Sequence, residues 1–155
     1  MKARFTNKAA FDIIGVSCRS NPNESLHKLW ADFMSRVQEI PNVSDHQKAY
    51  QVCVYDDANA SEEIYTFIAG MEVSAIDLVP DGMIAHRVPK AHYAVFEHHG
   101  LLDTLHQSYA YIYGVWLAEN NYELAEADSL EVYDERFKVG EEDSVFEIWV
   151  PLKAK

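Results

Sequence analysis

The sequence predicts an α+β domain made of two β-α-β-β units. An extended apolar run precedes each of two amphipathic helical stretches, and two further extended runs follow each of them. The turn sequence Pro80-Asp81-Gly82 separates the two halves. We therefore expect one domain over residues 1–155, with repeat units at about 1–79 and 82–155 related by pseudo-twofold symmetry. Each unit should place one long helix on an antiparallel sheet, with a ligand cleft between the units.

The first helix is predicted between Asn21 and Pro41. Asn21 can cap the helix, Pro22 suits the first helical position, and Glu24 completes a capping box. Apolar side chains then recur at steps of three and four along one face, at Leu26, Trp30, Phe33, Val37 and Ile40. This stripe is typical of a helix packed on a core, and Trp30 is expected to belong to that core.

The second helix is predicted from just after Gly100 to about Asn120. Its apolar stripe has the same spacing and more aromatic rings, at Leu102, Leu105, Tyr109, Ile112 and Trp116. Trp116 ends this stripe, where an aromatic side chain more often packs in a core than lines a pocket. Pocket lining by Trp116 stays open as the alternative.

Six extended runs complete the two units. Two of them precede the helices, near residues 11–19 and 83–98. The four that follow the helices are Tyr50–Tyr55, Ile64–Val73, Leu130–Phe137 and Val145–Leu152.

Glu131 is the most informative residue of these strands. Alternation places Leu130 and Val132 on one face of the strand and Glu131 and Tyr133 on the other. A carboxylate beside an aromatic ring suits an organic cation, because the ring face alone attracts a cation by ~0.5–2 kcal/mol. The alternative is a strand whose polar face is simply exposed to water.

Composition limits the partners. The chain has 155 residues and a net charge of −12, which argues against nucleic acid and anionic membranes, because both are bound by clustered Lys and Arg. Cys18 and Cys53 lie in apolar runs and are expected to be buried free thiols in a reducing compartment. No run has the length of a membrane span or a secretory signal, so we expect a cytoplasmic protein.

Metal and cofactor motifs are missing from the sequence. The chain is rich in histidine, but no His-Glu-x-x-His or Cys-x-x-Cys pair accompanies His86, His92, His98, His99 and His106. A phosphate-binding glycine loop and a Gly-x-Ser-x-Gly nucleophile motif are also missing. We expect no metal, no cofactor and no covalent catalysis.

Several segments, taken in order, resemble the GyrI-like effector-binding family, which includes the drug-binding domains of AraC-type and MerR-type regulators. These segments are Leu26–Phe33, Ile68–Val73, Tyr93–His98 with Gly100, Gly114–Leu117, Leu130–Tyr133 and Glu147–Pro151. The resemblance implies a cleft for bulky aromatic, often cationic molecules, with a glutamate on a strand of the second unit as the countercharge. Glu131 matches that position.

The resemblance also implies aromatic walls, whose members must be argued from this sequence. Tyr133 shares a face with Glu131. Trp149 lies with Glu147 on the strand expected to pair with that of Glu131, and Trp116 is a further candidate. Tyr50 and Phe67 could face the cleft from the first unit, although the sequence does not determine their register.

Three functions are consistent with this reading. We favour a stand-alone protein that binds a hydrophobic organic cation without turnover, because the sequence contains no helix-turn-helix or basic recognition helix. One alternative that the resemblance implies is hydrolysis of reactive electrophilic small molecules, with Glu97, Glu131 or Glu147 activating water and Tyr133 assisting. The other, implied by the name of the family, is direct inhibition of a protein partner such as DNA gyrase.

Overall fold

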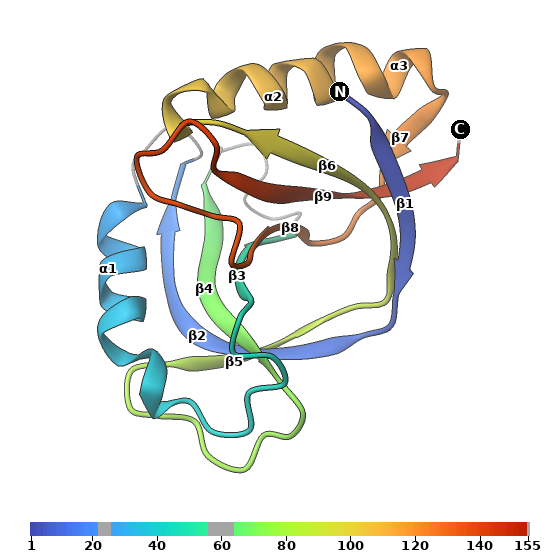
Figure 1. Cartoon of the computed structure of the whole chain (residues 1–155). Coiled ribbons are helices and arrows are strands. Elements are labelled where there is room, and N and C mark those ends of the chain that lie inside the picture. Colours follow the sequence, from blue (N-terminus) through green and yellow to red (C-terminus); the bar gives the residue numbers. More distant parts are fainter. Residues whose placement is uncertain (22–25, 56–63, 155) are drawn as a thin grey trace.

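The computed structural model describes residues 1–21, 26–55 and 64–154. The chain forms a nine-stranded antiparallel sheet that curves strongly on itself, with two helical segments against its outer side (Figure 1). The α+β class predicted from the sequence is confirmed.

The two halves contain the same succession of elements. The first half consists of β1 (Ala3–Lys8), β2 (Phe11–Ser20), α1 (His27–Arg36), η1 (Val37–Glu39), β3 (Ala49–Val54) and β4 (Tyr65–Val73). The second half begins with β5 (Ile84–Val88) and β6 (Ala91–His99). It continues with a nearly unbroken helical segment made of η3 (Leu102–Thr104), α2 (Leu105–Tyr111), η4 (Ile112–Trp116) and α3 (Leu117–Glu119). It ends with β7 (Tyr122–Leu124), β8 (Ser129–Tyr133) and β9 (Val145–Ala154).

The strand order is symmetric about the centre of the sheet. It runs β1-β6-β9-β8 and then β3-β4-β2-β5, while β7 pairs with β9 outside this path. Counted outward from the central β3–β8 pair, equivalent strands follow in the same order: β3, β4, β2 and β5 in one direction, and β8, β9, β6 and β1 in the other. We call the β3–β8 pair the seam between the units. This order confirms two β-α-β-β units related by a pseudo-twofold axis.

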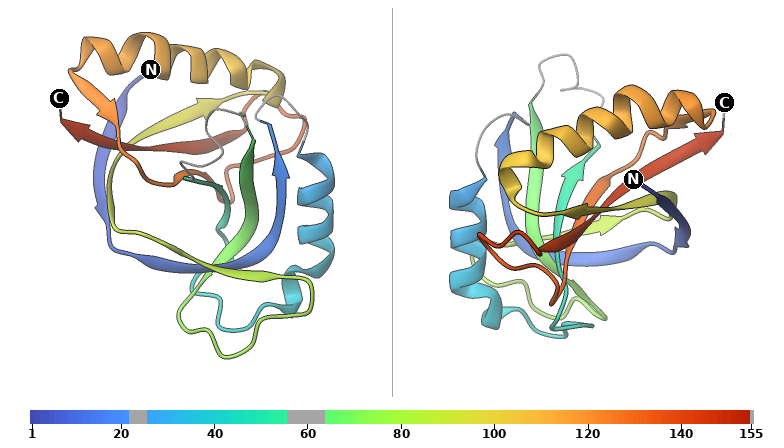
Figure 2. Two further views of the ribbon diagram at one scale, coloured as in Figure 1. Left: turned by 180° about the vertical axis from the view of Figure 1, so that it is seen from behind. Right: turned by 45° about the horizontal axis from the view of Figure 1, so that its top comes forward.

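The first two strands of each unit pair with the first two strands of the other unit, and this pairing brings the two ends of the sheet together. Lys8 of β1 pairs with Ala91 of β6, and Phe11 of β2 pairs with Val88 of β5, so one ladder continues directly into the other. The sheet consequently encloses an interior, as the views in Figure 2 show.

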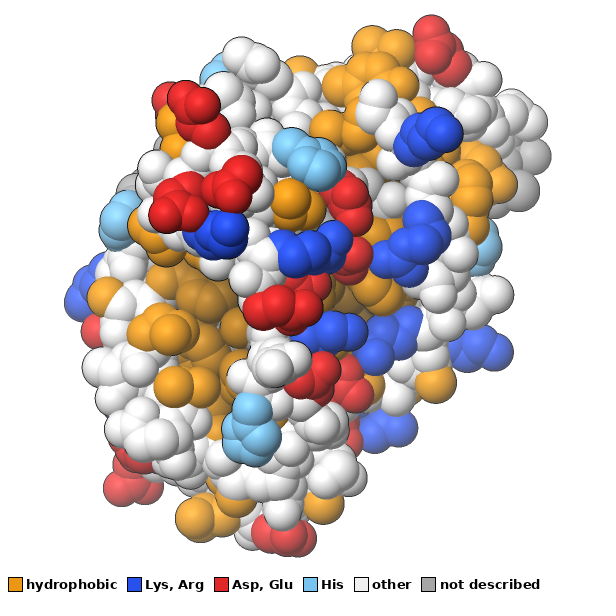
Figure 3. Space-filling view, in the orientation of Figure 1, with side chains coloured by type: hydrophobic (Ala, Val, Ile, Leu, Met, Phe, Trp, Pro, Cys, Tyr) orange, Lys and Arg blue, Asp and Glu red, His pale blue; other side chains and the backbone are white. Residues whose placement is uncertain are grey.

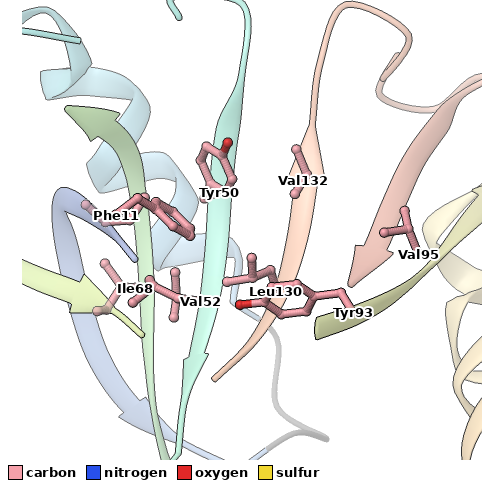
Figure 4. Close-up of a cluster of buried hydrophobic side chains, with 10 residues drawn as sticks. Phe11, Tyr50, Val52, Ile68, Tyr93, Val95, Leu130 and Val132 are labelled. Carbon is pink, nitrogen blue, oxygen red and sulfur yellow. The ribbon is translucent and has the colours of Figure 1, made fainter. Parts of the chain in front are cut away.

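The enclosed side of the sheet is an apolar core whose described members all come from strands. Its labelled members in Figure 4 include Phe11, Tyr50, Val52, Tyr93 and Leu130, which come from strands of both units. Burial of these side chains stabilises the closed sheet by ~25 cal/mol for each Å² removed from water.

The outer side of the sheet carries the two helices. Leu29 and Phe33 of α1 pack against the strands of the first unit. Ile112 and Trp116 of the second helical segment pack against Phe96 and other residues of β6 and β9. The predicted apolar stripes therefore face the sheet, with α1 on one unit and α2 on the other, except for Leu102, which is 49% exposed.

Several element boundaries differ from the sequence-based expectation. β1 was not predicted, because this strand at one end of the strand order contains many polar residues and shows no clear alternation of apolar and polar side chains. The run near residues 83–98 is two strands, separated at Pro89, whose missing N–H cannot contribute to a ladder. The strand that contains Glu131 ends at Tyr133, before Phe137. The predicted capping residues Pro22 and Glu24 lie outside the described residues.

Among the described residues, the helices are all too short or too polar to cross a membrane.

Candidate functional site

Glu131 is a buried carboxylate on the outer, helix-bearing face of the sheet, beside the seam between the two units. Only 7% of its surface is exposed, and its neighbours Leu130 and Val132 point into the enclosed core. Its two oxygens each accept a hydrogen bond from a phenol: Oε1 from Tyr133 on β8 and Oε2 from Tyr109 on α2. Strand alternation therefore places the carboxylate under the second helix, where both phenols cover it.

Burial controls the ionisation of this cluster. Desolvation raises the pKa of Glu131 above its ordinary value, although the two phenol hydrogen bonds and the nearby His98 oppose the shift. Burial also raises the pKa values of Tyr109 and Tyr133 well above that of free tyrosine, so both remain hydrogen-bond donors. In the part of the chain that the structure describes, neither Lys nor Arg forms an ion pair with Glu131. The carboxylate is thus a buried acid without a full countercharge.

Aromatic rings surround this carboxylate. The ring of Tyr133 meets that of Trp30 edge-on at 5.1 Å between centroids and stacks on Phe146 at 4.6 Å. Tyr109 stacks on Tyr113 at 5.8 Å, and Tyr113 is 40% exposed. The rings therefore form a path from Glu131 to the surface.

Gln51 on β3 is the cross-strand partner of Glu131, so the two side chains share a face of the sheet. The indole Nε1 of Trp30 donates a hydrogen bond to Gln51 Oε1 at 2.8 Å. Trp30 on α1 thus contacts both Gln51 and Tyr133, and is not only a core residue as its helical spacing predicted. Sequence reasoning missed Gln51, because a neutral residue is recognised only once the β3–β8 register is known.

Trp149 does not lie with Glu131. Its cross-strand partner on β8 is Leu130, whereas the partner of Glu131 is Ile148. Because paired residues share a face, Trp149 points toward the enclosed side of the sheet. There its ring meets Tyr93 at 5.3 Å, and its Nε1 donates to Glu147 Oε1 at 3.0 Å. The predicted pairing of these two strands is confirmed, but its register places Trp149 and Glu131 on opposite faces of the sheet, and ligand binding by Trp149 stays a prediction.

The remaining aromatic candidates also lie apart from the carboxylate. Tyr50 belongs to the enclosed core, and its hydroxyl donates to Glu72 at 3.2 Å. Phe67 is on the helix-bearing face but packs in the core beneath α1. Trp116 lies seven residues after Tyr109 on the second helical segment. Its ring packs edge-on against Phe96 and stacks on Tyr122, with centroid distances of 5.0 Å and 5.8 Å. Ligand binding by these residues stays a prediction.

Two surface cavities lie away from Glu131. One, of about 280 Å³, lies between β2 and α1, and the other, of about 430 Å³, lies beside β1 and β6. On the face shown in Figure 3, hydrophobic side chains gather in a hollow beside a band of acidic and basic side chains. Because Tyr109 and Tyr133 cover Glu131, a ligand reaches the carboxylate only when at least one of these phenols moves.

The raised pKa of Glu131 predicts how stability depends on pH. The folded protein binds the Glu131 proton more tightly than the unfolded chain does, because the pKa of Glu131 is raised on folding. The resulting stabilisation is fully present below the unfolded pKa of about 4.3 and is lost as the pH rises through the folded pKa. Glu131→Gln cannot ionise, so we expect its free energy of unfolding to increase relative to wild type across this interval. Urea denaturation at a series of pH values measures the difference, and a difference independent of pH would contradict the burial of an ionising carboxylate.

The chain is similar to known proteins over its whole length. The model of the GyrI-like small molecule binding domain matches residues 1–153. The transcriptional regulator BrlR of Pseudomonas aeruginosa is 31% identical over 154 residues, which cover 98% of this chain and 56% of the regulator. The chain thus spans little more than half of that relative.

Solved structures have the same fold. SAV2435 bound to tetraphenylphosphonium superposes with a TM-score of 0.75 at 15% identity and covers 99% of this chain and 94% of its own. The C-terminal domain of EcmrR superposes with a TM-score of 0.75 at 16% identity, covering 99% of this chain and 98% of its own. Because this family match extends across both units, the chain belongs to the GyrI-like small molecule binding domain family.

Proposed function

We propose that this domain binds bulky, hydrophobic aromatic cations and uses Glu131 as their countercharge. The observation that supports this most strongly is a carboxylate with 7% exposure that accepts two phenol hydrogen bonds and forms no ion pair with the described Lys and Arg residues. The tetraphenylphosphonium bound to SAV2435, a protein of the same fold, belongs to this ligand class.

The physical basis is that burying the Glu131 carboxylate costs more without a bound cation than with one. A buried carboxylate without a countercharge is unfavourable, so a cation that enters beside Glu131 relieves part of that cost. A lipophilic cation is suited to this environment because its charge is spread over apolar groups. Burial of its surface contributes ~25 cal/mol per Å², and each ring that faces the charge adds ~0.5–2 kcal/mol.

Access determines which ligands can bind. Tyr109 and Tyr133 occupy the positions next to both carboxylate oxygens. An incoming cation must displace at least one of these hydroxyls, so its attraction to the carboxylate must exceed that of a hydrogen bond to a charged group, which contributes about 1.5–3 kcal/mol net. Neutral ligands of the same shape gain only the apolar contribution.

Two ions of nearly the same shape and opposite charge test this function directly. Tetraphenylphosphonium and tetraphenylborate each carry four phenyl groups around a central atom. We expect calorimetric titration to detect tetraphenylphosphonium binding and to give an affinity for tetraphenylborate lower by about 100-fold or more. Equal affinities would show that binding depends on apolar area alone and would overturn the proposal.

Trp30 and Trp149 provide a matched pair of ring deletions. Trp30→Leu removes a ring that contacts Tyr133 and an N–H that binds Gln51, whereas Trp149→Leu removes a ring from the opposite face of the sheet. We expect the first change to weaken tetraphenylphosphonium binding by about 3- to 30-fold and the second to alter it by less than about twofold. Calorimetry on both variants, with circular dichroism to check folding, measures this contrast. The reverse order would place the ligand on the Trp149 side.

A further inference from the structure

Gln51 occupies, in the first unit, the position that Glu131 occupies in the second. The two residues form the middle pair of the five-pair β3–β8 ladder. The strand order is the same in both directions away from this ladder, so the pseudo-twofold axis of the domain passes close to the pair. A rotation about that axis exchanges β3 with β8 and places Gln51 near Glu131.

The surroundings of the two side chains are also related by this symmetry. Gln51 accepts a hydrogen bond at 2.8 Å from Trp30 on α1, the helix of the first unit. Glu131 accepts one from Tyr109 on α2, the helix of the second unit. Each helix thus supplies one aromatic donor to the central pair. The important difference is charge, because one member of the pair is a carboxylate and the other is a neutral amide.

We infer that Gln51 restricts this site to ligands with a single positive charge, because its amide stands where a second carboxylate would otherwise accept a second charge. This inference rests on the proposed function and identifies a specificity-determining residue for it. The Cβ atoms of directly opposed residues in antiparallel strands lie about 4.5–5.5 Å apart, so one ligand can contact both side chains. A second positive charge near Gln51 would lose its hydration without gaining an ion pair.

The substitution Gln51→Glu changes this charge with little change in shape. A glutamate at this position retains an oxygen that can accept the Trp30 hydrogen bond. Because two adjacent carboxylates favour sharing a proton, binding is best measured at about pH 8, where ionisation of both is more complete. Gln47→Glu is the matched control, since Gln47 is exposed to water in the turn before β3 and its substitution adds the same charge.

Ethidium and propidium are suitable probes because they share a phenanthridinium ring and carry one and two positive charges. We expect the wild-type protein to prefer ethidium. Gln51→Glu should shift the ratio of the two affinities toward propidium by about tenfold or more, while Gln47→Glu leaves the ratio within about twofold of wild type. Fluorescence titration of both dyes measures each affinity. Equal ratios in the two variants would overturn the role of Gln51.

The double variant Gln51→Glu/Glu131→Gln tests the symmetry without changing net charge. It moves the single carboxylate to the other unit, so we expect it to recover most of the ethidium affinity that Glu131→Gln alone loses. A double variant that binds ethidium no better than Glu131→Gln would show that the side chain at position 51 does not contact the charge of the ligand. If the wild-type protein binds neither dye, the proposed function itself fails, whereas ethidium binding with unaltered ratios rejects only the inference about Gln51.

Discussion

Glu131→Gln is expected to lower the affinity for tetraphenylphosphonium by about 100-fold, which corresponds to ~2.7 kcal/mol. The variant keeps the side-chain shape and offers a hydrogen-bonding partner to each phenol, but removes the charge that attracts the cation. The effect is large because Glu131 is 7% exposed, so water screens the interaction much less than at the surface. Calorimetric titration of the wild type and the variant measures the difference.

Two controls separate charge from packing in this experiment. Glu119→Gln removes the same charge from an exposed position on α3, and its affinity should stay within about twofold of wild type. Triphenylphosphine oxide is a neutral phenyl-rich ligand whose binding to Glu131→Gln should be little altered. If the variant lost the neutral ligand and the cation equally, the effect would come from packing and not from the carboxylate.

Gly15→Ala is expected to destabilise the protein by about 3 kcal/mol or more. Gly15 on β2 pairs with Gly70 on β4, where an added Cβ would lie 2.1 Å from the carbonyl oxygen of Ala69 and 2.5 Å from the Cα of Gly70. Both contacts are with backbone, so side-chain rearrangement cannot relieve them. The change would separate two strands beneath α1, the helix that positions Trp30 over Gln51.

Gly114→Ala is the matched substitution. Gly114 lies in the helical segment, and a Cβ there would meet nothing within 4 Å. Because alanine is favoured over glycine in a helix by about 0.8–1.0 kcal/mol, we expect a small gain in stability. Urea denaturation of the two variants measures both effects. A Gly15→Ala protein as stable as wild type would contradict the close approach of β2 and β4.

The fold was largely predictable because it depends on periodicity. The apolar stripes that include Phe33 and Ile112 face the sheet as predicted, and Glu131 and Tyr133 share a face as alternation requires. The order of elements was enough to identify two repeated units, even though their residues differ.

The composition of the site was less predictable because it depends on register between strands. A shift of one residue moves a side chain to the other face of a sheet, and this explains why Trp149 lies with Leu130 and not with Glu131. Gln51 could be recognised only from its pairing, and Tyr109 and Trp30 only from where their polar atoms point. Their helical spacing is that of core residues, so the spacing gave no sign of the hydrogen bonds that the Tyr109 hydroxyl and the Trp30 indole N–H donate.

The most direct test of the role of Glu131 is the pKa of its carboxyl group, measured by ¹³C NMR in the free protein and in the presence of tetraphenylphosphonium. The assignment is made by comparison with Glu131→Gln. Burial predicts a pKa above the ordinary glutamate value in the free protein. A bound cation next to the carboxylate should favour the charged form and lower that pKa, and acidification should correspondingly weaken binding. If the protein binds tetraphenylphosphonium and the pKa of Glu131 stays unchanged, Glu131 is not the countercharge of the bound cation.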